Sequence, residues 1–369
     1  MRRQLFPIAA IIAAAVLMSF AIPPASAQSL SKGKGDLRVM TYNINEGTDY
    51  REVQAAADWN AFVFAVGQTI TQVRLTNSPA RMKAIAKQII AARPTLVGLQ
   101  EVDKWWTGPI DATGTCGPLK IEYNFLNELN SALKQQGAQY KVVVQAHNWE
   151  LGPMPGFIWQ TNTFLCVKVS DQVVILARTD LDPAEFQLTN PQAQPFENLL
   201  QFPIPGTPYT VPFTRGWASV DVTFHGRAFR FVSTHLESVV PEINRLQGGE
   251  LRLGPANTSL PVIIAMDGNS QAFPFPQDAT YLDFISDGYL DVWSELFPSR
   301  PGLTCCQAQL DNNVKSQLYQ RIDLLLTKGP IEAQKVARFG ITQASKTPGG
   351  LWPSDHAGVA AQVVVRQGD

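Results

Sequence analysis

Residues 262–269 read Val-Ile-Ile-Ala-Met-Asp-Gly-Asn, an apolar run that stops at a carboxylate. Such a run is typical of a strand buried on at least one face, and the residues after it are typical turn formers. The same arrangement recurs along the chain. Other short apolar segments lead into Asn43, Glu101, His235 and Asp323, and the pair Asp355–His356 precedes the last apolar run.

Taken singly, each of these endings is explained as a turn or a structural side chain, but together they indicate a site. Strand ends at one edge of a sheet lie about 5 Å from their neighbours, so we expect these side chains to converge. Carboxylates and amides supply the hard oxygen ligands that Mg²⁺ prefers, and they leave positions for water and a substrate phosphate. The mixture therefore favours metal-assisted hydrolysis of a phosphate ester.

Apolar runs bounded by polar or turn residues predict strands, and apolar residues at helical spacing predict helices. Strands are expected at Leu37–Tyr42, Leu96–Leu99, Lys141–Val144, Val173–Leu176, Ala218–Phe224, Ala228–Ser233, Val262–Ala265, Arg321–Leu326 and Val359–Val365. Helices are expected at Ala80–Ala92, Ile121–Gln135 and Pro241–Leu253. Mixed elements of this kind, with a hairpin turn at His225–Gly226, predict an α/β protein with antiparallel strand pairs and outer helices. Ordered surface loops are expected at Asp103–Pro118, His147–Asn162 and Asp182–Arg215.

The first 27 residues predict a cleaved secretory signal peptide. Two arginines are followed by the uncharged stretch Leu5–Ile22 and by Ala25-Ser26-Ala27, a small-x-small cleavage signal. An uncleaved membrane anchor is the alternative, and Pro7 interrupts the apolar stretch that it would need. We therefore expect one domain over residues 35–369, located in the periplasm or outside the cell.

Charge and composition exclude some classes of protein. The chain has 30 Lys and Arg against 31 Asp and Glu, and it is 45% hydrophobic and 17% charged, so it should fold. The basic residues are scattered, which argues against non-specific coating of DNA because such binding depends on clustered cations. A nuclease with a local basic groove remains compatible with this balance.

The four cysteines permit disulfides in an exported chain. The simplest pairing joins Cys116 to Cys166 and leaves the adjacent Cys305 and Cys306 as a vicinal bridge. Free buried thiols are the alternative. Neither a CxxC pair nor a histidine pair at ligand spacing is present, so nothing indicates zinc.

The order of the polar motifs resembles the endonuclease/exonuclease/phosphatase superfamily, which includes deoxyribonucleases, apurinic endonucleases, bacterial sphingomyelinases, tyrosyl-DNA phosphodiesterases and inositol polyphosphate 5-phosphatases. The resemblance implies a four-layer α/β sandwich, in which two mixed sheets pack face to face with helices outside and the site at one end. The matching segments, in the family's order, are Thr41-Tyr42-Asn43, Leu99-Gln100-Glu101-Val102, Ser233-Thr234-His235-Leu236, Asp267-Gly268-Asn269, Arg321-Ile322-Asp323 and Ser354-Asp355-His356.

The resemblance also implies a metal site. Glu101 would be the principal Mg²⁺ ligand, with Asn43 beside it and Asp355 nearby or acting through water. Mn²⁺ is the alternative metal.

The remaining residues would act on the phosphate and the water. His356 would transfer a proton and bind the scissile phosphate, oriented by Asp323. Asp267 and Asn269 would position the attacking water or a phosphate oxygen, and His235 would donate to another phosphate oxygen. Whether Asp267 or His356 activates the water is left open.

The substrate, a nucleic acid, a phospholipid or a small molecule, is also left open. A nuclease predicts a basic groove, and a phosphatase predicts a narrow pocket lined by Lys or Arg. A sphingomyelinase-like enzyme predicts exposed apolar tips, for which Pro153–Trp159 and Phe202–Phe213 are candidates. Arg178 and Arg215 are candidates to hold the substrate phosphate. Trp105–Trp106 could stack on a base, touch a lipid or pack locally.

Two features bear on which subgroup of the superfamily the chain resembles. Thr234-His235-Leu236-Glu237-Ser238 is similar to the corresponding motif of tyrosyl-DNA phosphodiesterases, but export argues against a role in DNA repair. Met266 and Gly268 depart from the residues that many relatives carry, which weakens assignment to a subgroup.

No protein partner is implied, a monomer is expected, and His147 and His225 are expected to be non-catalytic. The alternative from another class is a catalytically inactive surface-binding protein on the same scaffold.

Overall fold

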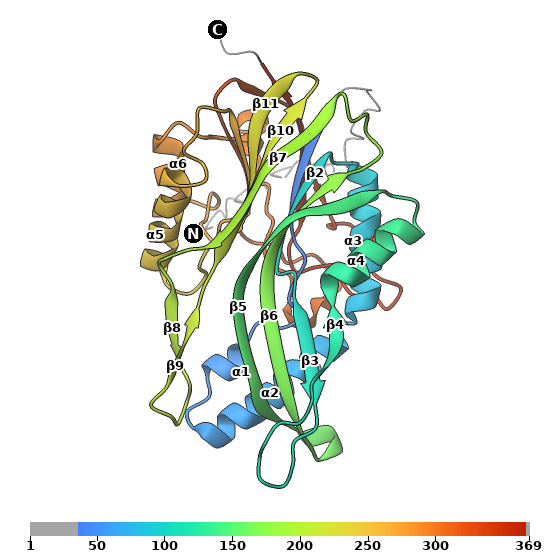
Figure 1. The fold of residues 1–369 in the computed structure, drawn as a ribbon, viewed down its shortest axis with the longest axis vertical. Coiled ribbons are helices and arrows are strands. Elements are labelled where there is room, and N and C mark those ends of the chain that lie inside the picture. Colours follow the sequence, from blue (N-terminus) through green and yellow to red (C-terminus); the bar gives the residue numbers. More distant parts are fainter. Residues whose placement is uncertain (1–35, 367–369) are drawn as a thin grey trace, which may run out of the picture.

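A computed structural model describes residues 36–366 of the chain, so the expected signal peptide lies outside the described residues. Two β-sheets run along the long axis of the molecule, and helices lie on their outer sides (Figure 1). Within residues 36–366, no helix combines the length and the apolar character needed to cross a membrane.

The first sheet has eight strands in the order β15-β16-β1-β2-β6-β3-β4, with β5 also paired to β6. β1 and β2 are parallel and the other pairs are antiparallel, so the sheet is mixed. The strands are β1 (Leu37–Asn43), β2 (Leu96–Gln100), β3 (Lys104–Gly108), β4 (Lys120–Asn124), β5 (Tyr140–Ile158), β6 (Thr163–Arg178), β15 (Ile331–Phe339) and β16 (Gly358–Val365).

The second sheet has six strands in the order β13-β14-β12-β11-β10-β7, and here only β11 and β12 are parallel. A separate two-stranded ribbon, β8–β9, projects from the connection between β7 and β10 (Figure 1). The strands are β7 (Phe186–Pro195), β8 (Leu200–Pro203), β9 (Thr210–Phe213), β10 (Gly216–Phe224), β11 (Arg227–His235), β12 (Val262–Asp267), β13 (Leu290–Asp291) and β14 (Asp323–Lys328).

The helices cover both outer faces of the sheet pair. Helices α1 (Arg51–Gln54), α2 (Trp59–Leu75), α3 (Ser78–Ala92) and α4 (Phe125–Gln135) share a core with the first sheet. Helices α5 (Pro241–Leu253) and α6 (Ala279–Ser286) share one with the second, and the short α7 (Val292–Leu296) follows β13. A third core fills the space between the sheets. This is the four-layer α/β sandwich that the motif order implied.

Strand β12 shows why the residues at 262–267 form a central strand. Ile263 and Ala265 point into the core between the sheets, whereas Ile264 and Met266 point into the core beneath α5 and α6. Both faces are therefore buried, so the run is apolar throughout and does not alternate. The sheets approach closely at Gly98, where a Cβ atom would lie 2.8 Å from the hydroxyl oxygen of Ser233.

Several expected loops contain strands. Residues Asp103–Pro118 include β3, Asp182–Arg215 include β7, β8 and β9, and most of His147–Asn162 belongs to β5. Pairing of β5 with β6 shifts register at three places, so turn formers such as Gly152 and Pro153 lie inside a strand. These irregularities interrupt the alternation that would have marked the segment as a strand.

The ends of two other elements differ from the expectation. The helix expected at Ile121–Gln135 begins at Phe125, because residues 120–124 form β4 and the side chain of Asn124 caps the helix. The strand expected from Arg321 begins at Asp323.

The hairpin and both cysteine pairs match the expectation. His225 and Gly226 both have positive φ, 47° and 74°, as a type I′ turn between β10 and β11 requires. Cys116 is bonded to Cys166, which ties the loop after β3 to β6, and Cys305 is bonded to Cys306.

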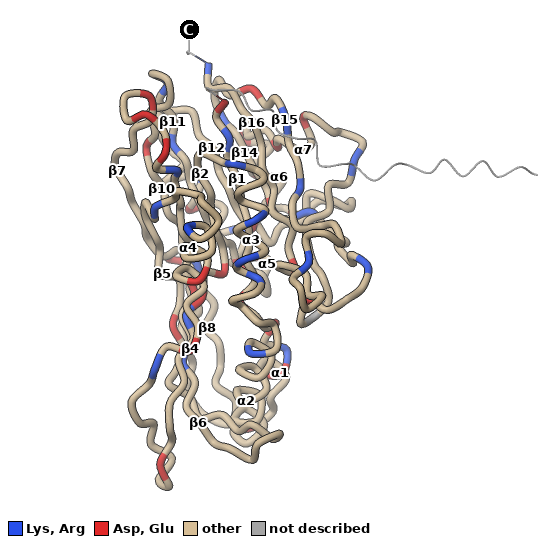
Figure 2. The backbone as a smooth tube through the Cα atoms, turned by 90° about the vertical axis from the view of Figure 1, so that its right-hand side faces the viewer, with Lys and Arg blue, Asp and Glu red and all other residues tan. Residues whose placement is uncertain are grey.

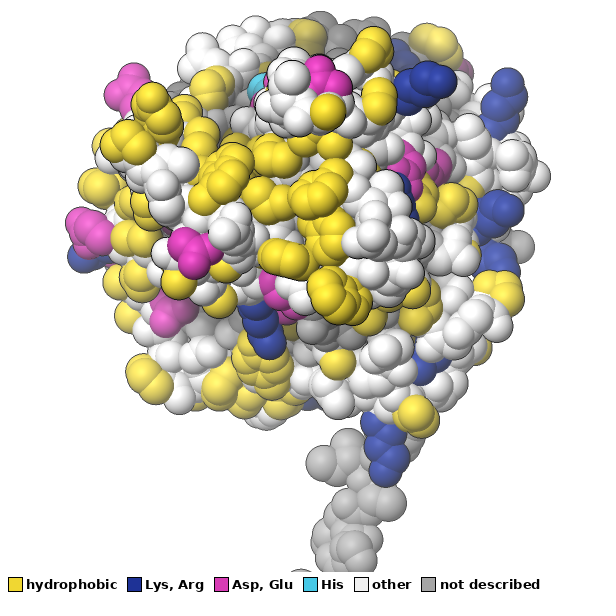
Figure 3. All heavy atoms as spheres, turned by 90° about the horizontal axis from the view of Figure 1, so that it is seen from below, with side chains coloured by type: hydrophobic (Ala, Val, Ile, Leu, Met, Phe, Trp, Pro, Cys, Tyr) yellow, Lys and Arg dark blue, Asp and Glu magenta, His cyan; other side chains and the backbone are white. Residues whose placement is uncertain are grey.

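Aromatic side chains gather at the end of the molecule where β5 and β6 are joined. The ring centroid of Phe157 lies 5.1 Å from that of Phe64 on α2 and 4.7 Å from that of Phe164. The side chain of Trp159 is 75% exposed. Figure 3 shows hydrophobic side chains grouped on the face seen from this end. The candidate apolar tip at Pro153–Trp159 therefore ends in an exposed aromatic patch.

Candidate active site

The register of the central strands brings the polar endings together. Asn43 pairs with Gln100 across β1 and β2, next to Glu101. In the second sheet, Asp267 pairs with both His235 and Asp323. Two sets of ligand atoms each lie within 4.8 Å of one another, and they share Asp267; the sets are Glu101, His235 and Asp267, and Asp267, Asp323 and His356. The expected convergence is therefore present, at the seam between the two sheets.

Asn43 bridges carboxylates that belong to different sheets. Its Nδ2 atom donates to Glu101 Oε1 at 2.7 Å and to Asp267 Oδ2 at 2.8 Å. Its Oδ1 atom accepts from the backbone N–H of Asn45 at 3.0 Å. The carboxamide is thereby fixed at both ends, and it holds the two carboxylates a short distance apart.

Glu101 lies where the chain turns sharply after β2. Its φ of 55° is in the left-handed region, which directs the side chain away from the strand direction. Its Oε2 atom accepts from the backbone N–H of Glu46 at 2.8 Å. Burial raises the pKa of Glu101 to about 7, and the nearby charge of Asp355 adds to this rise. A buried carboxylate that resists ionisation in the absence of a cation is well suited to bind one.

His356 and Asp323 form a buried carboxylate–imidazole pair. Nδ1 of His356 lies 2.8 Å from Oδ2 of Asp323 and 3.7 Å from Oδ2 of Asp267. Burial alone would lower the pKa of His356, but the surrounding carboxylates, led by Asp323, raise it well above its usual value. With Nδ1 engaged by Asp323, Nε2 is the nitrogen left to exchange a proton with a substrate.

His235, unlike His356, is held in the neutral state. Nη1 of Arg215 lies 3.0 Å from Nδ1 of His235, and a guanidinium can only donate, so Nδ1 accepts and Nε2 carries the proton. That N–H faces Oδ2 of Asp267 at 3.5 Å and not Nδ2 of Asn269, a donor that lies 2.9 Å from Nε2 and donates to the carbonyl of Leu236 at 3.0 Å. Burial, together with the charges of Arg215 and His356, lowers the pKa of His235 well below its usual value. The ring is therefore a neutral hydrogen-bond donor.

Asp267 stands between the two imidazoles. Its Oδ1 atom accepts from the backbone N–H of Asn269 at 3.0 Å. Burial raises the pKa of Asp267 to about 6, against the opposing effect of His356. This carboxylate is ionised at neutral pH and can accept a proton at little cost, as a general base requires.

The donor set fits a hard divalent cation. Glu101, Asp355 and Asp267 offer carboxylate oxygens, and the surrounding ligand candidates are imidazole and amide groups. Mutual repulsion among buried carboxylates is relieved when a cation is bound, and oxygen ligands are those that Mg²⁺ and Mn²⁺ prefer.

The structure brings one of the two candidate arginines to this site. Arg215 reaches it through His235, as described above. Arg178 does not, because it follows Ala177, which pairs with Leu96 at the opposite end of β2 from Glu101. There Arg178 is paired with Asp180 at 2.6 Å. The expectation that Arg178 holds substrate phosphate is therefore not supported by its position.

The structure also places the tryptophan pair whose role was left open and the two histidines expected to be non-catalytic. Trp105 is 1% exposed and packs in the core on the outer face of the first sheet, which leaves local packing as its role. Trp106 lies under the ammonium of Lys168, 5.2 Å from the ring centroid. His147 is exposed on β5, and His225 is exposed at the hairpin and lies 3.6 Å from Glu185.

Two buried polar residues support the site and were not singled out from the sequence. Arg81 on α3 donates to the backbone carbonyls of Ile44, at 2.8 Å, and Pro353, at 3.2 Å. It thereby joins the loop after Asn43 to the loop before Asp355. The sequence signal for Arg81 is weak, because an arginine in an amphipathic helix is ordinarily expected on the solvent-exposed face.

Asn244 on α5 has a similar function in the second sheet. Its Nδ2 atom donates to the carbonyl of Glu237 at 2.6 Å and to that of Gly268 at 2.9 Å. It thereby joins the loops that follow His235 and Asp267. A buried Asn within a predicted helix is the only hint of this in the sequence.

Charged side chains are dispersed over the rest of the molecule. Lys and Arg positions are scattered along the backbone among Asp and Glu positions (Figure 2). Many of the arginines are paired with acids, as Arg74 is with Glu122 at 2.6 Å and Arg245 with Asp283 at 2.7 Å. Over residues 36–366, this distribution lacks the clustered cations that polynucleotide binding uses.

The sequence profile of the Endonuclease/Exonuclease/phosphatase family matches residues 40–356. No curated protein sequence matches the chain significantly. The matched range runs from β1 to His356 and includes every polar ending described above.

Similar solved structures cover nearly the whole chain at low identity. A family protein from Bacteroides vulgatus is 14% identical with a TM-score of 0.53, over 90% of this chain and 100% of that one. A mannosyl-6-phosphatase from Bacteroides thetaiotaomicron is 16% identical with a TM-score of 0.50, over 89% and 99%. TDP2 of D. rerio, complexed with a single-strand DNA product, is 17% identical with a TM-score of 0.50, over 90% and 100%. At these identities the likeness shows the fold alone.

Proposed function

The chain belongs to the endonuclease/exonuclease/phosphatase family, whose members hydrolyse phosphate esters, and we propose that it is an exported hydrolase of phosphodiester or phosphomonoester bonds that uses Mg²⁺ or Mn²⁺. The observation that carries this proposal is the bridge formed by Asn43 between Glu101 and Asp267. It brings Glu101 of the first sheet, the proposed cation ligand, beside Asp267 of the second sheet, the proposed proton acceptor.

Glu101 and Asp355 would hold the metal, with Asn43 beside it orienting Glu101. When bound, the cation would polarise the phosphoryl group and neutralise charge that develops on its oxygens. The backbone N–H of Glu46 fixes the second oxygen of Glu101, so the carboxylate needs little reorganisation to bind.

The histidines would bind the phosphate and differ in proton content. His235 would donate a hydrogen bond from its Nε2–H group to a phosphoryl oxygen while remaining neutral. His356 would begin as an imidazolium held by Asp323 and would donate its Nε2 proton to the departing oxygen. Since a charged His356 cannot accept a proton, Asp267 would take one from the attacking water as its oxygen bonds to phosphorus and the P–O bond to the leaving group breaks.

The location and assembly state are part of the proposal. The leader at residues 1–27 and the two bonded cysteine pairs support an oxidising compartment, and we propose a periplasmic or extracellular monomer. N-terminal sequencing of the chain isolated from its host would read Gln28 first, whereas a sequence starting at Met1 would contradict export with cleavage.

The function is tested on the purified chain with bis(4-nitrophenyl) phosphate. Turnover should require Mg²⁺ or Mn²⁺ and stop with EDTA. Glu101→Ala and His356→Ala should each lower kcat by roughly 10²–10⁴, while Glu332→Ala, an exposed carboxylate on β15, serves as the matched control. Circular dichroism would verify folding. Undiminished turnover in EDTA would contradict the role of the metal. Turnover at the wild-type rate in Glu101→Ala or His356→Ala would contradict the role assigned to that residue.

The alternative, a catalytically inactive surface-binding protein, makes the opposite prediction: no hydrolysis with or without metal. No position among the polar endings has lost the side chain that the proposed chemistry needs. We therefore favour the enzyme.

A further inference from the structure

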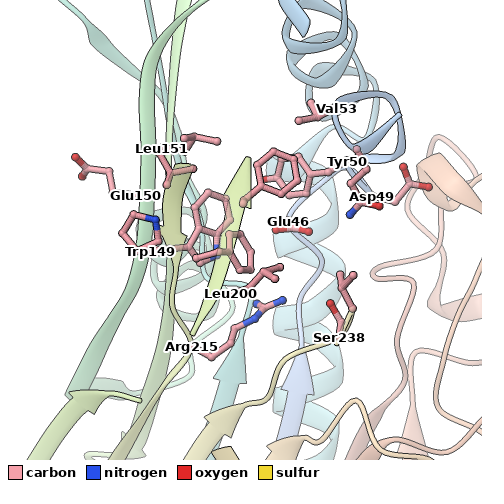
Figure 4. Close-up of a pocket in the computed structure, with 16 residues that line it drawn as sticks. Glu46, Asp49, Tyr50, Val53, Trp149, Glu150, Leu151, Leu200, Arg215 and Ser238 are labelled. Carbon is pink, nitrogen blue, oxygen red and sulfur yellow. The ribbon is translucent and has the colours of Figure 1, made fainter. Parts of the chain in front are cut away.

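An apolar pocket opens directly beside the candidate active site. It has a volume of about 300 Å³ and lies between the β1–α1 connection, β5 and the β8–β9 ribbon (Figure 4). Such a volume is at the lower end of the range of small-molecule sites, about 300–1,000 Å³. Its apolar wall is formed by Val53, Trp149, Leu151, Leu200, Phe202 and Phe213.

Two polar residues belong both to this pocket and to the site. Arg215, at the lower end of the pocket in Figure 4, donates to His235 at 3.0 Å. Glu46 lines the pocket with its side chain, and its backbone N–H donates to Glu101 at 2.8 Å. A substituent on a phosphorus atom held by His235 would therefore enter the pocket past these two residues.

The wall offers aromatic and aliphatic surface. The rings of Trp149 and Phe213 lie 4.6 Å apart, and Tyr50 meets Trp149 edge-on at 5.9 Å. The pocket shares Tyr50, Val53 and Leu151 with a smaller cavity of about 20 Å³ between α2 and the β5–β6 pair, whose lining is also mainly apolar. The apolar surface thus continues away from the site into the interior.

Three of the four charged residues that line the pocket, Asp49, Glu150 and Arg215, have an ion-pair partner, and burial raises the pKa of the fourth, Glu46, well above its usual value. Among the described lining residues, Arg215 is the single basic side chain, and it lies 3.5 Å from Asp171. At the rim, Asp49 is 3.0 Å from Arg51, and Glu150 is 2.7 Å from Lys168. A polynucleotide would bring a second phosphate here and would find acids and hydrocarbon.

We propose that this pocket binds an uncharged hydrocarbon substituent of the ester, so that the substrate class is an amphiphilic phosphate ester with an alkyl chain. This inference rests on the proposed function, because the pocket is assigned by its contact with the catalytic residues. Burial of the substrate's alkyl chain against Trp149, Leu151 and Leu200 supplies the binding free energy. Arg215 and Glu46 lie at the boundary between the pocket and the phosphate position.

The test compares methyl, butyl and hexyl 4-nitrophenyl phosphate with Mg²⁺ and the purified full chain. Each buried methylene is expected to raise kcat/KM about 3-fold, so burial of two of the five additional methylenes is enough for hexyl to exceed methyl by about 10-fold. Leu200→Trp, which fills the pocket from the ribbon outside both main sheets, should abolish that ratio. Leu246→Trp, an exposed leucine on α5 outside the pocket, is the matched control and should retain it.

A binding measurement separates this inference from the proposed function. Calorimetric titration with octylphosphonate and methylphosphonate should show tighter binding of the octyl compound to the wild-type chain but not to Leu200→Trp. Tight octyl binding without hydrolysis of any ester would support the pocket and overturn the proposed function. Hydrolysis with equal kcat/KM for methyl and hexyl, equal binding of both phosphonates, or faster cleavage of plasmid DNA than of the hexyl ester would overturn the pocket assignment.

Discussion

The hydrogen bond between Arg215 and His235 decides what that imidazole can do. Because the guanidinium donates to Nδ1 at 3.0 Å, the ring proton is confined to Nε2, and the positive charge of Arg215 opposes a second proton. We predict that Arg215→Gln raises the pKa of His235 toward its usual value of about 6.5. Burial, the largest cause of the low pKa, persists in the variant, so its ring should take up a proton at a higher pH than the wild-type ring does. Nitrogen NMR shifts of His235 between pH 5 and 8 would measure this.

Arg215→Lys is the matched control, because it keeps the positive charge and should keep the pKa of His235 low. We expect kcat of Arg215→Gln to fall by about 10², the loss typical of one misplaced donor to a developing oxyanion. If His235 in Arg215→Gln shows the same neutral tautomer throughout this pH range, Arg215 does not set its protonation.

At this scale, the sequence predicts the residues that end strands but not those that hold them. Glu101 and His356 follow or precede apolar runs, so pattern and chemistry point to them together. Arg81 contacts the carbonyl of Ile44, 37 residues away, and Asn244 contacts that of Gly268, 24 residues away. Arg215 acts through the ring of His235 on another strand. Such contacts leave no local periodicity, so they emerge only when the chain is folded.

Helix α2 and strand β5 show how closely two elements must pack on the outer face of the first sheet. A Cβ atom on Gly67 would lie 1.9 Å from the carbonyl oxygen of Phe157, so only glycine permits this approach. We predict that Gly67→Ala lowers the free energy of unfolding by about 1–3 kcal/mol through overpacking, although alanine favours a helix. Gly249→Ala on α5 is the control, because its Cβ would contact nothing within 4 Å and should stabilise by about 0.5–1 kcal/mol. Urea denaturation of both variants would measure the difference, and equal stability would show that α2 can move away from β5.

The same pair explains which elements the sequence predicts poorly. Helices α3 and α5 are found from helical spacing, whereas α2 is rich in aromatic and β-branched residues and is buried on several sides. Strand β5 contains bulges and prolines that resemble loop signals. Both depend on contact with each other, and long-range packing of this kind overrides local propensity.

At the scale of the whole molecule, the site joins two sheets that each contribute negative charge. Glu101 follows a strand of the first sheet, and Asp267 and Asp323 come from the second, so carboxyl groups from both sheets meet at the seam of the sandwich. Folding therefore brings like charges together in a buried place, and Asn43 and His356 only partly compensate. A bound cation would remove this repulsion and hold the two sheets together, so metal and stability should be linked.

We predict that the stabilising effect of the metal grows with pH. In the metal-free protein, the pKa of Glu101 is raised from 4.5 to about 7, so the stability contributed by its proton is full below pH 4.5 and is lost as the pH rises through 7. Saturating Mg²⁺ at about 100 times its Kd should then restore about 2.7 kcal/mol at pH 8 and much less at pH 5, where protons occupy the carboxylate. Thermal melts in EDTA and in Mg²⁺ at both pH values would measure this.

Glu101→Gln should melt higher than wild type in EDTA at pH 8 and respond little to Mg²⁺, because it lacks the charge that both effects need. An equal Mg²⁺ shift at pH 5 and pH 8, or a full shift in Glu101→Gln, would show that the cation binds elsewhere.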